Sequence, residues 1–341
     1  MLDEQPSTYD FAREEVVILA TRCVQALAAI GIIISLTGAL PTMSHADPTT
    51  FRIGQSSPAN TFLAIWMADD AGFYEANGLK LEIVPMAGGR DMAGAFASGR
   101  IDAMHIGLSS VVRANAANAD LRAFGSLSNV IRFALFGKPG LKSPNDLKGG
   151  TVAISSLGSE SDATLPLMLG KLGLTRADVQ IKELGVQRLA AVQAGEITAT
   201  AVNEPDRSRA YAAGLPALVD LATQRIPWLF TGLVAKRSFI SDNRDTMIRF
   251  LKATIQGNRL AISDEQRAKA VLQKQFGISD QKIIDISYAD FKEQTPPNAE
   301  IDIDAARAVV AQIAKPDASH DLKDYVDTSL QDTLKAEGFV K

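Results

Sequence analysis

One short segment that occurs twice constrains the fold of this chain more than any other feature. Residues 95–104 (AFASGRIDAM) are matched ninety-six positions later by residues 191–200 (AVQAGEITAT), with four identities in ten. Each copy has the pattern of a helix end, a glycine (Gly99 or Gly195) and a short apolar segment. Glycine adopts the left-handed conformation that ends a helix without steric cost. The apolar segments lack alternation, which is typical of strands buried on both faces. The repeat therefore predicts two similar β–α–β units.

Strand and helix patterns alternate along most of the remaining chain. This alternation predicts mostly parallel sheets with helices on both faces, so we expect an α/β protein with two doubly wound lobes. From residue 245 onward the apolar spacing is helical. No low-complexity linker separates the lobes, which predicts short ordered crossings at residues 131–137 and 228–235. The expected lobes comprise residues 47–140 with 224–341, and residues 141–223.

The N-terminal segment differs in kind from the rest. Residues 24–40 are apolar and are followed by Ser44-His45-Ala46, which supplies the small residues at −3 and −1 that signal peptidase requires. Seventeen helical residues span about 26 Å, which is less than the roughly 30 Å hydrocarbon core of a membrane. We expect a signal peptide over residues 1–46, cleaved after Ala46, and a periplasmic product. The alternative is a retained membrane anchor. Residues 1–21 are acidic, unlike a signal n-region, and a translation start near Val16 would explain this.

Composition excludes several classes of function. The net charge of −4 comes without a basic stripe, so no nucleic-acid partner is expected. Cys23 is the single cysteine and precedes the predicted cleavage point, which leaves no disulfide or thiolate beyond it. His105 and His320 are far apart in sequence, and His105 lies in a buried strand pattern typical of a hydrogen-bonded core histidine. With no recognisable metal, nucleophile or phosphate-binding motif, we expect no enzyme activity, no metal and no cofactor.

Several loops have the composition of a ligand-binding cleft. In open α/β sheets, ligands bind beyond the carboxyl ends of strands, where helix N-termini present free N–H groups. The predicted loops of this kind are residues 55–60, 88–90, 107–110, 156–161 and 203–205, which are rich in hydroxyls, glycines and amides. For any single serine, helix capping is the alternative role. The candidate ligand-binding residues are Ser56, Ser57, Asn60, Gly88, Gly89, Arg90, Ser109, Ser128, Ser159, Glu160, Asn203, Glu204, Trp228 and Thr231.

Aromatic and basic side chains near these loops give further candidates. Trp228, beside a proline at a predicted crossing, is the best stacking candidate for a ligand. Arg90 is the first arginine to test against an anion. Arg132 and Arg188 could also pair with an anion, although an exposed arginine is the ordinary case.

With these residues in hand, the chain resembles the periplasmic solute-binding proteins of the nitrate/sulfonate/taurine family of ABC transporters. That group is similar to the pyrimidine synthase of thiamine biosynthesis. The resemblance depends on residues 71–79 (AGFYEANGL), residues 97–103 (ASGRIDA), residues 143–149 (SPNDLKG) and the Glu204-Pro205 pair. It covers residues 51–339.

The resemblance implies a type II periplasmic-binding-protein fold, with two α/β lobes joined by two crossover strands and a ligand cleft between them. Gly158-Ser159 matches a glycine–serine pair at the second-lobe helix of sulfonate-binding relatives. In those relatives an aromatic residue often follows the acid–proline pair, whereas here Asp206 follows Glu204-Pro205. The implied function is that of the substrate-binding component of an ABC importer. The implied partners are a small-molecule ligand and an inner-membrane permease with its ATPase, and we expect a monomer.

The ligand class follows from the same loops. Helix N-termini and hydroxyls converging on one point predict a small organic anion, a sulfonate or a carboxylate. Glu160 and Glu204, if both face the cleft, would instead favour a neutral aminopyrimidine or a ligand with a cationic part. An enzyme of this fold is the remaining alternative. The related enzymes use cysteine or histidine- and cysteine-rich chemistry, which this chain lacks beyond residue 46.

Overall fold

The computed structural model of this chain describes residues 47–86 and 92–340. The predicted signal peptide and the predicted ligand-binding residues Gly88, Gly89 and Arg90 lie outside these ranges. Residues Pro48–Lys341 form one compact unit. Within the described ranges, no helix is both long enough and apolar enough to cross a membrane.

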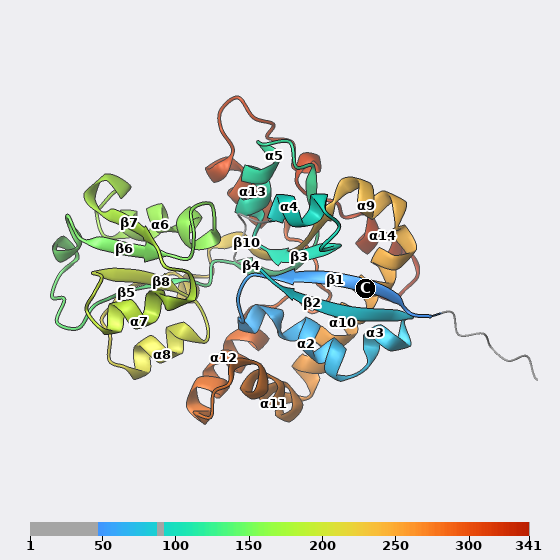
Figure 1. Ribbon diagram of the computed structural model, residues 1–341, viewed down its shortest axis with the longest axis horizontal. Coiled ribbons are helices and arrows are strands. Elements are labelled where there is room, and N and C mark those ends of the chain that lie inside the picture. Colours follow the sequence, from blue (N-terminus) through green and yellow to red (C-terminus); the bar gives the residue numbers. More distant parts are fainter. Residues whose placement is uncertain (1–46, 87–91, 341) are drawn as a thin grey trace, which may run out of the picture. The chain divides into compact units, whose positions relative to one another are not determined.

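Two five-stranded sheets organise this unit, and they share one plan (Figure 1). The first sheet has the order β2-β1-β3-β10-β4 and the second has the order β7-β6-β8-β5-β9. In each sheet the first three strands are parallel and the fourth is antiparallel to its neighbours. The strands are β1 (Thr49–Gln55), β2 (Leu79–Pro85), β3 (Ala103–Ile106), β4 (Leu121–Val130), β5 (Ala134–Gly137), β6 (Thr151–Ile154), β7 (Gln180–Glu183), β8 (Ala199–Val202), β9 (Ala217–Asp220) and β10 (Pro227–Lys236).

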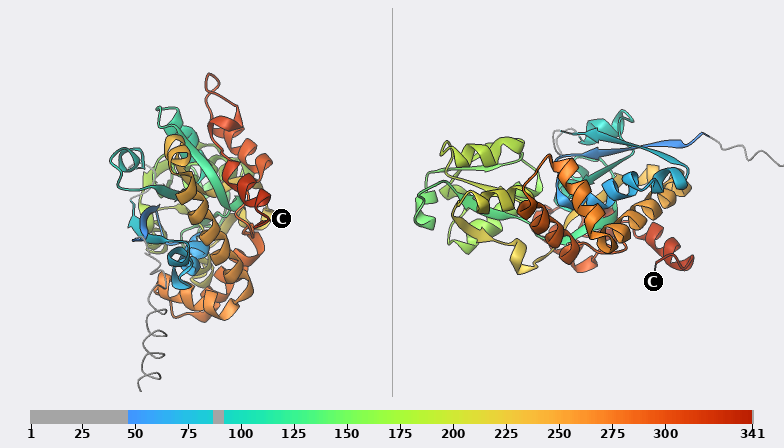
Figure 2. Two further views of the ribbon diagram at one scale, coloured as in Figure 1. Left: turned by 90° about the vertical axis from the view of Figure 1, so that its right-hand side faces the viewer. Right: turned by 90° about the horizontal axis from the view of Figure 1, so that it is seen from below.

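Helices pack against both sheets, as the alternating pattern predicts. Those after β10, coloured orange to red in Figure 2, pack around the first sheet, where Phe250 of α10 stacks on Phe51 of β1 at 4.1 Å between ring centroids. We call the first sheet with its helices the first lobe and the second sheet with its helices the second lobe. The α-helices are α2 (Leu63–Asp70), α3 (Phe73–Ala76), α4 (Met92–Ala97), α5 (Leu108–Asn115), α6 (Glu160–Lys171), α7 (Arg188–Gln193), α8 (Asp206–Ala212), α9 (Arg237–Asp242), α10 (Arg244–Ser263), α11 (Glu265–Phe276), α12 (Gln281–Gln294), α13 (Ile303–Ile313) and α14 (Ser329–Ala336).

The sequence repeat corresponds to the same local structure in both lobes. Gly99 after α4 and Gly195 after α7 have φ angles of 67° and 75°, in the left-handed region. The next residue in each copy donates a hydrogen bond back into the helix, from Arg100 N to the Ala95 carbonyl at 2.9 Å and from Glu196 N to the Ala191 carbonyl at 3.0 Å. The chain then enters β3 or β8, the third strand of its sheet. The predicted duplication is confirmed.

The first crossing between the lobes is shorter than predicted, and the second lies elsewhere. β5 pairs with β8 and β9, so the chain changes sheet over residues 131–133, ahead of the expected boundary at residue 140. Residues 228–235, expected as the second crossing, lie inside β10, which pairs with β3 and β4 of the first sheet. The second crossing is the segment 221–226 between β9 and β10. An apolar segment buried on both sides is typical of both crossings and central strands, so its sequence could not separate the two.

The left-handed glycines give a test of the repeat. Because a Cβ at Gly195 would meet no other atom within 4 Å, Gly195→Ala should cost only the backbone penalty, about 1 kcal/mol of unfolding free energy. Gly170, inside α6 and equally free of neighbours, is the matched control, and Gly170→Ala should instead stabilise the protein by about 0.5 kcal/mol. Urea denaturation of both variants measures this. Equal effects of the two substitutions would contradict the assigned conformation.

Candidate ligand-binding cleft

A cavity of about 400 Å³ lies between the two lobes. Its lining follows the carboxyl ends of β1, β3, β6 and β8, where Ser56, Gly107, Ser155 and Asn203 come directly after the strands. The loops predicted at residues 55–60, 107–110, 156–161 and 203–205 all contribute lining residues. This is the position at which open α/β sheets bind ligands.

The structure brings some of the predicted site residues to the cavity and places others beside it. Those that line the cavity are Ser56, Ser57, Ser159, Glu160, Asn203 and Thr231. Ser109 and Trp228 contact Glu160. Ser128 donates a hydrogen bond to the Val130 carbonyl at 3.2 Å.

Asn60 and Glu204, also predicted for the site, are buried in polar contacts of their own. The Asn60 amide donates to the Ser287 carbonyl at 2.9 Å and to the Asp290 carboxylate at 2.7 Å. Glu204 accepts a hydrogen bond from Arg207 at 3.0 Å. Burial, followed by the charge of Asp290, raises the pKa of Glu204. These contacts use the polar groups of both side chains within the protein.

Serine hydroxyls gather where β6 passes into α6. The hydroxyls of Ser155, Ser159 and Ser161 lie 2.9 Å from one another, and that of Ser159 also donates to the Ser156 carbonyl at 2.7 Å. Ser159 is the N-cap of α6, so this cluster coincides with the positive end of the helix dipole. All four serines line the cavity.

Arg188, at the start of α7, adds a full positive charge to the second-lobe side of the cavity. It is only 6% exposed, which corrects the expectation of an exposed arginine. Its Nε donates to the Ala201 carbonyl at 2.9 Å and its Nη1 to the Gly185 carbonyl at 2.6 Å. Burial lowers its pKa, and the charge of Asp206 opposes that change. Among the described residues Arg188 forms no ion pair, so a buried cation borders the cavity without a carboxylate partner.

Glu160, the first residue of α6, joins the two lobes. One carboxylate oxygen accepts hydrogen bonds from the main-chain N–H of Ser109, at 3.0 Å, and from the Ser109 hydroxyl. The other accepts from the indole N–H of Trp228 at 2.8 Å. A carboxylate of the second lobe thereby binds the N-terminal turn of α5 in the first lobe, where the helix dipole favours negative charge.

Gly107 allows this approach. A Cβ at this position would lie 2.0 Å from the Glu160 carboxylate oxygen and 2.2 Å from its carboxylate carbon. Any other side chain would force the glutamate away from α5. Two further contacts accompany it, a hydrogen bond of 3.2 Å from the Ser110 hydroxyl to the Gly158 carbonyl and an ion pair of 3.7 Å between Arg113 and Asp162.

The opposite side of the cavity, in the first lobe, carries polar atoms that have no hydrogen-bond partner within the described protein. These are Thr61 Oγ1, His105 Nε2 and Thr231 Oγ1. His105 is buried, as the strand pattern predicts, but it also lines the cavity. Burial lowers the pKa of His105 to about 4, so the imidazole is neutral at physiological pH.

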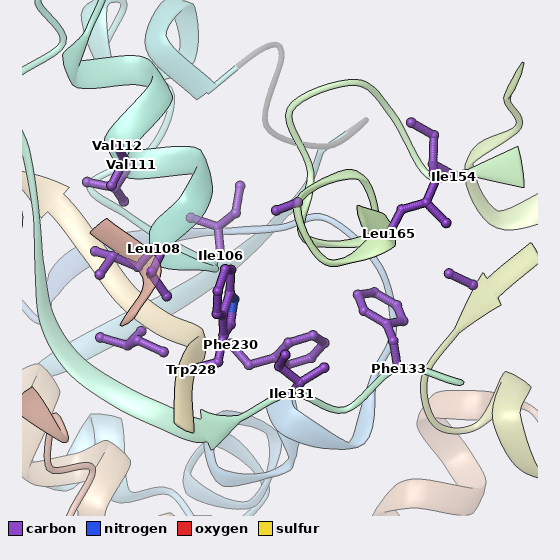
Figure 3. Close-up of a cluster of buried hydrophobic side chains, with 14 of the residues drawn as sticks. Ile106, Leu108, Val111, Val112, Ile131, Phe133, Ile154, Leu165, Trp228 and Phe230 are labelled. Carbon is purple, nitrogen blue, oxygen red and sulfur yellow. The ribbon is translucent and has the colours of Figure 1, made fainter. Parts of the chain in front are cut away.

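Phe133 and Phe230 form the aromatic part of the cavity wall (Figure 3). Their ring centroids are 5.0 Å apart with an interplanar angle of 75°, an edge-to-face pair. Phe133 lies on the first crossing and Phe230 on β10. Trp228, the predicted stacking residue, is 2% exposed and is not part of the described lining.

Sequence reasoning did not select His105, Phe133 or Phe230 as ligand-binding residues, and it ranked Arg188 behind Arg90 as the partner of an anion. Phe230 was missed because it lines the cavity together with its neighbour Thr231, at a register irregularity on each side of Thr231 in the β10–β4 pairing. Such a bulge re-aims side chains and breaks the alternation. For Arg188, its place at the head of the second repeated helix was the available signal, because that helix follows a strand end.

The class of the protein follows from this arrangement. Two α/β lobes of matching strand order, with a cavity at the carboxyl ends of the strands between them, form the fold of the two-lobe periplasmic binding proteins. The sequence profile of the NMT1/THI5-like family matches residues 59–268. The chain belongs to that family, and the resemblance expected from its motifs is confirmed.

Solved structures and curated relatives agree with this assignment. The periplasmic aliphatic sulphonate-binding protein SsuA from Escherichia coli is 25% identical, with a TM-score of 0.62 over 78% of this chain and 91% of SsuA. The nitrate-binding protein NrtA from Synechocystis PCC 6803 is 15% identical, with a TM-score of 0.68 over 84% of this chain and 89% of NrtA. The riboflavin-binding protein RibY from Chloroflexus aurantiacus is 31% identical over 130 residues, 37% of this chain. That match spans only 36% of the length of RibY.

An enzyme also shares the fold. The desulfurization enzyme DszB is 15% identical in its complex with biphenyl-2-sulfinic acid, with a TM-score of 0.63 over 85% of this chain and 99% of DszB. Within the described residues of this chain, no group of histidine, cysteine or acidic side chains could hold a metal ion.

The contact around Glu160 can be tested through Gly107. Gly107→Ala should displace the carboxylate from Ser109 and Trp228 and leave buried donors unpaired, which typically costs about 1–3 kcal/mol. Since Trp66 and Trp228 are the only tryptophans, fluorescence in a Trp66→Phe background reports on the Trp228 environment. Ser110→Ala, which removes only the neighbouring 3.2 Å bond, is the control and should leave the emission unchanged. An unchanged spectrum in Gly107→Ala would contradict the contact.

The same carboxylate should make stability depend on pH. Burial raises the pKa of Glu160 to about 7 from its ordinary 4.5, against the opposing effect of its hydrogen bonds. The folded protein therefore binds the Glu160 proton more tightly than the unfolded chain does. The stabilisation that comes from this protonation is full below pH 4.5 and is lost as the pH rises to about 7. The Tm of the wild type relative to Glu160→Gln should accordingly fall between pH 5 and 7.5. A Tm difference between the two proteins that does not change with pH would contradict the raised pKa of Glu160.

Proposed function

We propose that this protein is the substrate-binding component of an ABC importer and that it captures a small organic anion in the cavity between its lobes. The observation that carries this proposal is Arg188, a buried guanidinium at the cavity without an ion-pair partner among the described residues. A buried charge without a partner is costly, and a ligand anion would offset that cost.

The serine cluster supports the same ligand charge. Ser155, Ser159 and Ser161 surround the N-terminus of α6, on the same lobe as Arg188. A hydrogen bond to a charged group typically contributes about 1.5–3 kcal/mol, and a helix N-terminus contributes about 0.3–1 kcal/mol. Several such contacts together suffice for tight binding of one anionic group.

The remaining wall favours an organic ligand over a small inorganic ion. Met86, Ile106, Phe133 and Phe230 line the cavity, and its volume falls in the range of roughly 300–1,000 Å³ that is usual for small-molecule sites. Nitrate would leave this apolar surface without contacts. An anion with a carbon body would cover it.

Glu160 and Glu204, which would favour a neutral or cationic ligand if they faced the cleft, have partners within the protein. Glu160 lines the cavity, but Ser109 and Trp228 hydrogen-bond its carboxylate. Glu204 is not part of the described lining, and Arg207 pairs with it at 3.0 Å. Neither supplies a free carboxylate for a cationic ligand. A neutral heteroaromatic ligand remains the second candidate, supported by the Phe133–Phe230 pair and by the riboflavin-binding relative.

Binding rather than catalysis is the role we propose for the cavity. Its described lining has serine hydroxyls and one histidine but no cysteine. The serine hydroxyls of the second lobe hydrogen-bond one another. His105 lies in β3 of the first lobe, whereas these serines belong to the second lobe. We further propose that the protein acts as a monomer in the periplasm, after cleavage of residues 1–46, and delivers its ligand to an inner-membrane permease with its ATPase.

Calorimetric titration tests the ligand class. The panel comprises aliphatic and aromatic sulfonates, carboxylates, nitrate, taurine, aminopyrimidines and riboflavin. We expect organic sulfonates or carboxylates to bind and nitrate to bind weakly. Binding of a neutral compound with every anion silent would overturn the anion proposal and favour the second candidate.

The role of Arg188 gives a sharper prediction. Arg188→Gln should weaken anion binding by about 10–100-fold, the equivalent of one charged hydrogen bond. Its effect on the Tm of the unliganded protein should be small, because the loss of the hydrogen bonds to the Ala201 and Gly185 carbonyls is offset by the removal of a buried cation that has no counter-ion. Arg225→Gln is the matched control, since Arg225 is 57% exposed and pairs with the exposed Glu293. Undiminished affinity in Arg188→Gln would contradict the proposal.

A further inference from the structure

Three unpartnered polar atoms lie together on the first-lobe side of the cavity. Thr61 belongs to the short 3-10 helix Asn60–Phe62, His105 to β3 and Thr231 to β10. Their exposures are 0%, 4% and 8%, and all three line the cavity. β3 and β10 are hydrogen-bonded neighbours, with His105 opposite Leu233.

Leaving buried polar atoms without partners is unfavourable, and native proteins do so rarely. Most buried polar side chains of this protein are satisfied, as Thr254 shows by bonding both the Tyr74 hydroxyl and the Phe250 carbonyl. Of the eleven buried side-chain N and O atoms that lack a partner among the described residues, three border this one cavity, and their shared position calls for a common cause. A ligand group that completes their hydrogen bonds supplies one.

The protonation of His105 defines what that group must be. Main-chain carbonyl groups of Thr61 and of His105 itself face the imidazole and oppose the lowering of its pKa by burial. Carbonyl oxygens only accept, so the ring nitrogen that faces them carries the proton. In the neutral ring the other nitrogen, Nε2, is then an acceptor. The threonine hydroxyls can donate or accept.

We propose that Thr61, His105 and Thr231 form a second subsite of the cleft, which receives a neutral hydrogen-bond donor of the ligand, such as a hydroxyl or an amide N–H. The proposal rests on the proposed function, because it places the anionic group of the same ligand at Arg188 and the serines. The substrate class is thereby narrowed to a bifunctional anion, with a hydroxyl or amide at the end remote from its sulfonate or carboxylate.

An ammonium group suits this subsite less well than a hydroxyl. A buried cation needs a counter-charge, and Glu160 is the single acidic residue of the described lining. Its carboxylate already accepts hydrogen bonds from Ser109 and Trp228. The subsite itself offers only a neutral imidazole and two hydroxyls.

Matched ligand pairs test the proposal. Each pair is a straight-chain sulfonate or carboxylate of two to six carbons, with and without a terminal hydroxyl, titrated calorimetrically into the full protein. For at least one chain length, the hydroxylated member should bind about tenfold more tightly than its partner. In Thr231→Val that preference should fall several-fold, because one of the three polar groups of the subsite is removed. Thr254→Val, remote from the lining, should retain the preference.

A ligand-free measurement separates this role from a structural one. Thr231→Val removes an unsatisfied hydroxyl and should leave the Tm unchanged or higher, whereas Thr254→Val breaks two hydrogen bonds and should lower it. Binding of anions without any preference for the hydroxylated members overturns the subsite and leaves the proposed function intact. Silence of every anion in the panel overturns both. An equal loss of affinity for both ligands of a pair in Thr231→Val also overturns the subsite.

Discussion

Each sheet of this protein is completed by strands that the chain reaches only after crossing from the other sheet. β5 follows the first crossing and stands between β8 and β9, and β10 follows the second crossing and stands between β3 and β4. The two crossings are therefore short and are held at each end by sheet hydrogen bonds. The buried ion pair of Arg132, on the first crossing, with Asp290 of α12 ties that segment to the first lobe as well. The cavity lies between two lobes connected in this way, and Phe133 of the first crossing forms part of its wall.

Two buried ionisable side chains of the cavity, Glu160 and Arg188, differ in their partners within the protein. Glu160 is satisfied within the protein by donors of the other lobe, and Gly107 provides the space for its carboxylate. Arg188 has carbonyl partners only, among the residues that the structure describes. The first charge links the lobes, and the second is the group that we propose to bind the ligand anion. In the proposed function, binding of a ligand and contact between the lobes thus depend on separate groups, although both groups lie at helix N-termini of the same cleft.

The lobes share a strand order but not a surface chemistry. On the second lobe, Arg188 and the serines around α6 present donors and positive charge. On the first, His105 and two threonines present a neutral acceptor and hydroxyls. This asymmetry arises at equivalent strand ends, since β3 and β8 occupy the same place in their sheets. The duplicated architecture gives two similar faces, and the side chains at the strand ends make the two faces chemically different.

The sequence by itself determined the local structure. Glycine stops, capping residues and apolar periods act over a few neighbouring positions, so the repeated units, the α/β class and most of the cleft loops were predictable. Only the tertiary structure decided which strand joins which sheet, because the apolar sequences of β5 and β10 fit a crossing segment as well as a central strand. It also decided the state of single side chains. Arg188 is buried against the Ala201 carbonyl of β8, and Glu204 is buried near Asp290, whose charge helps to raise the pKa of Glu204. Burial and electrostatic partners depend on contacts across the fold, which spacing along the chain does not encode.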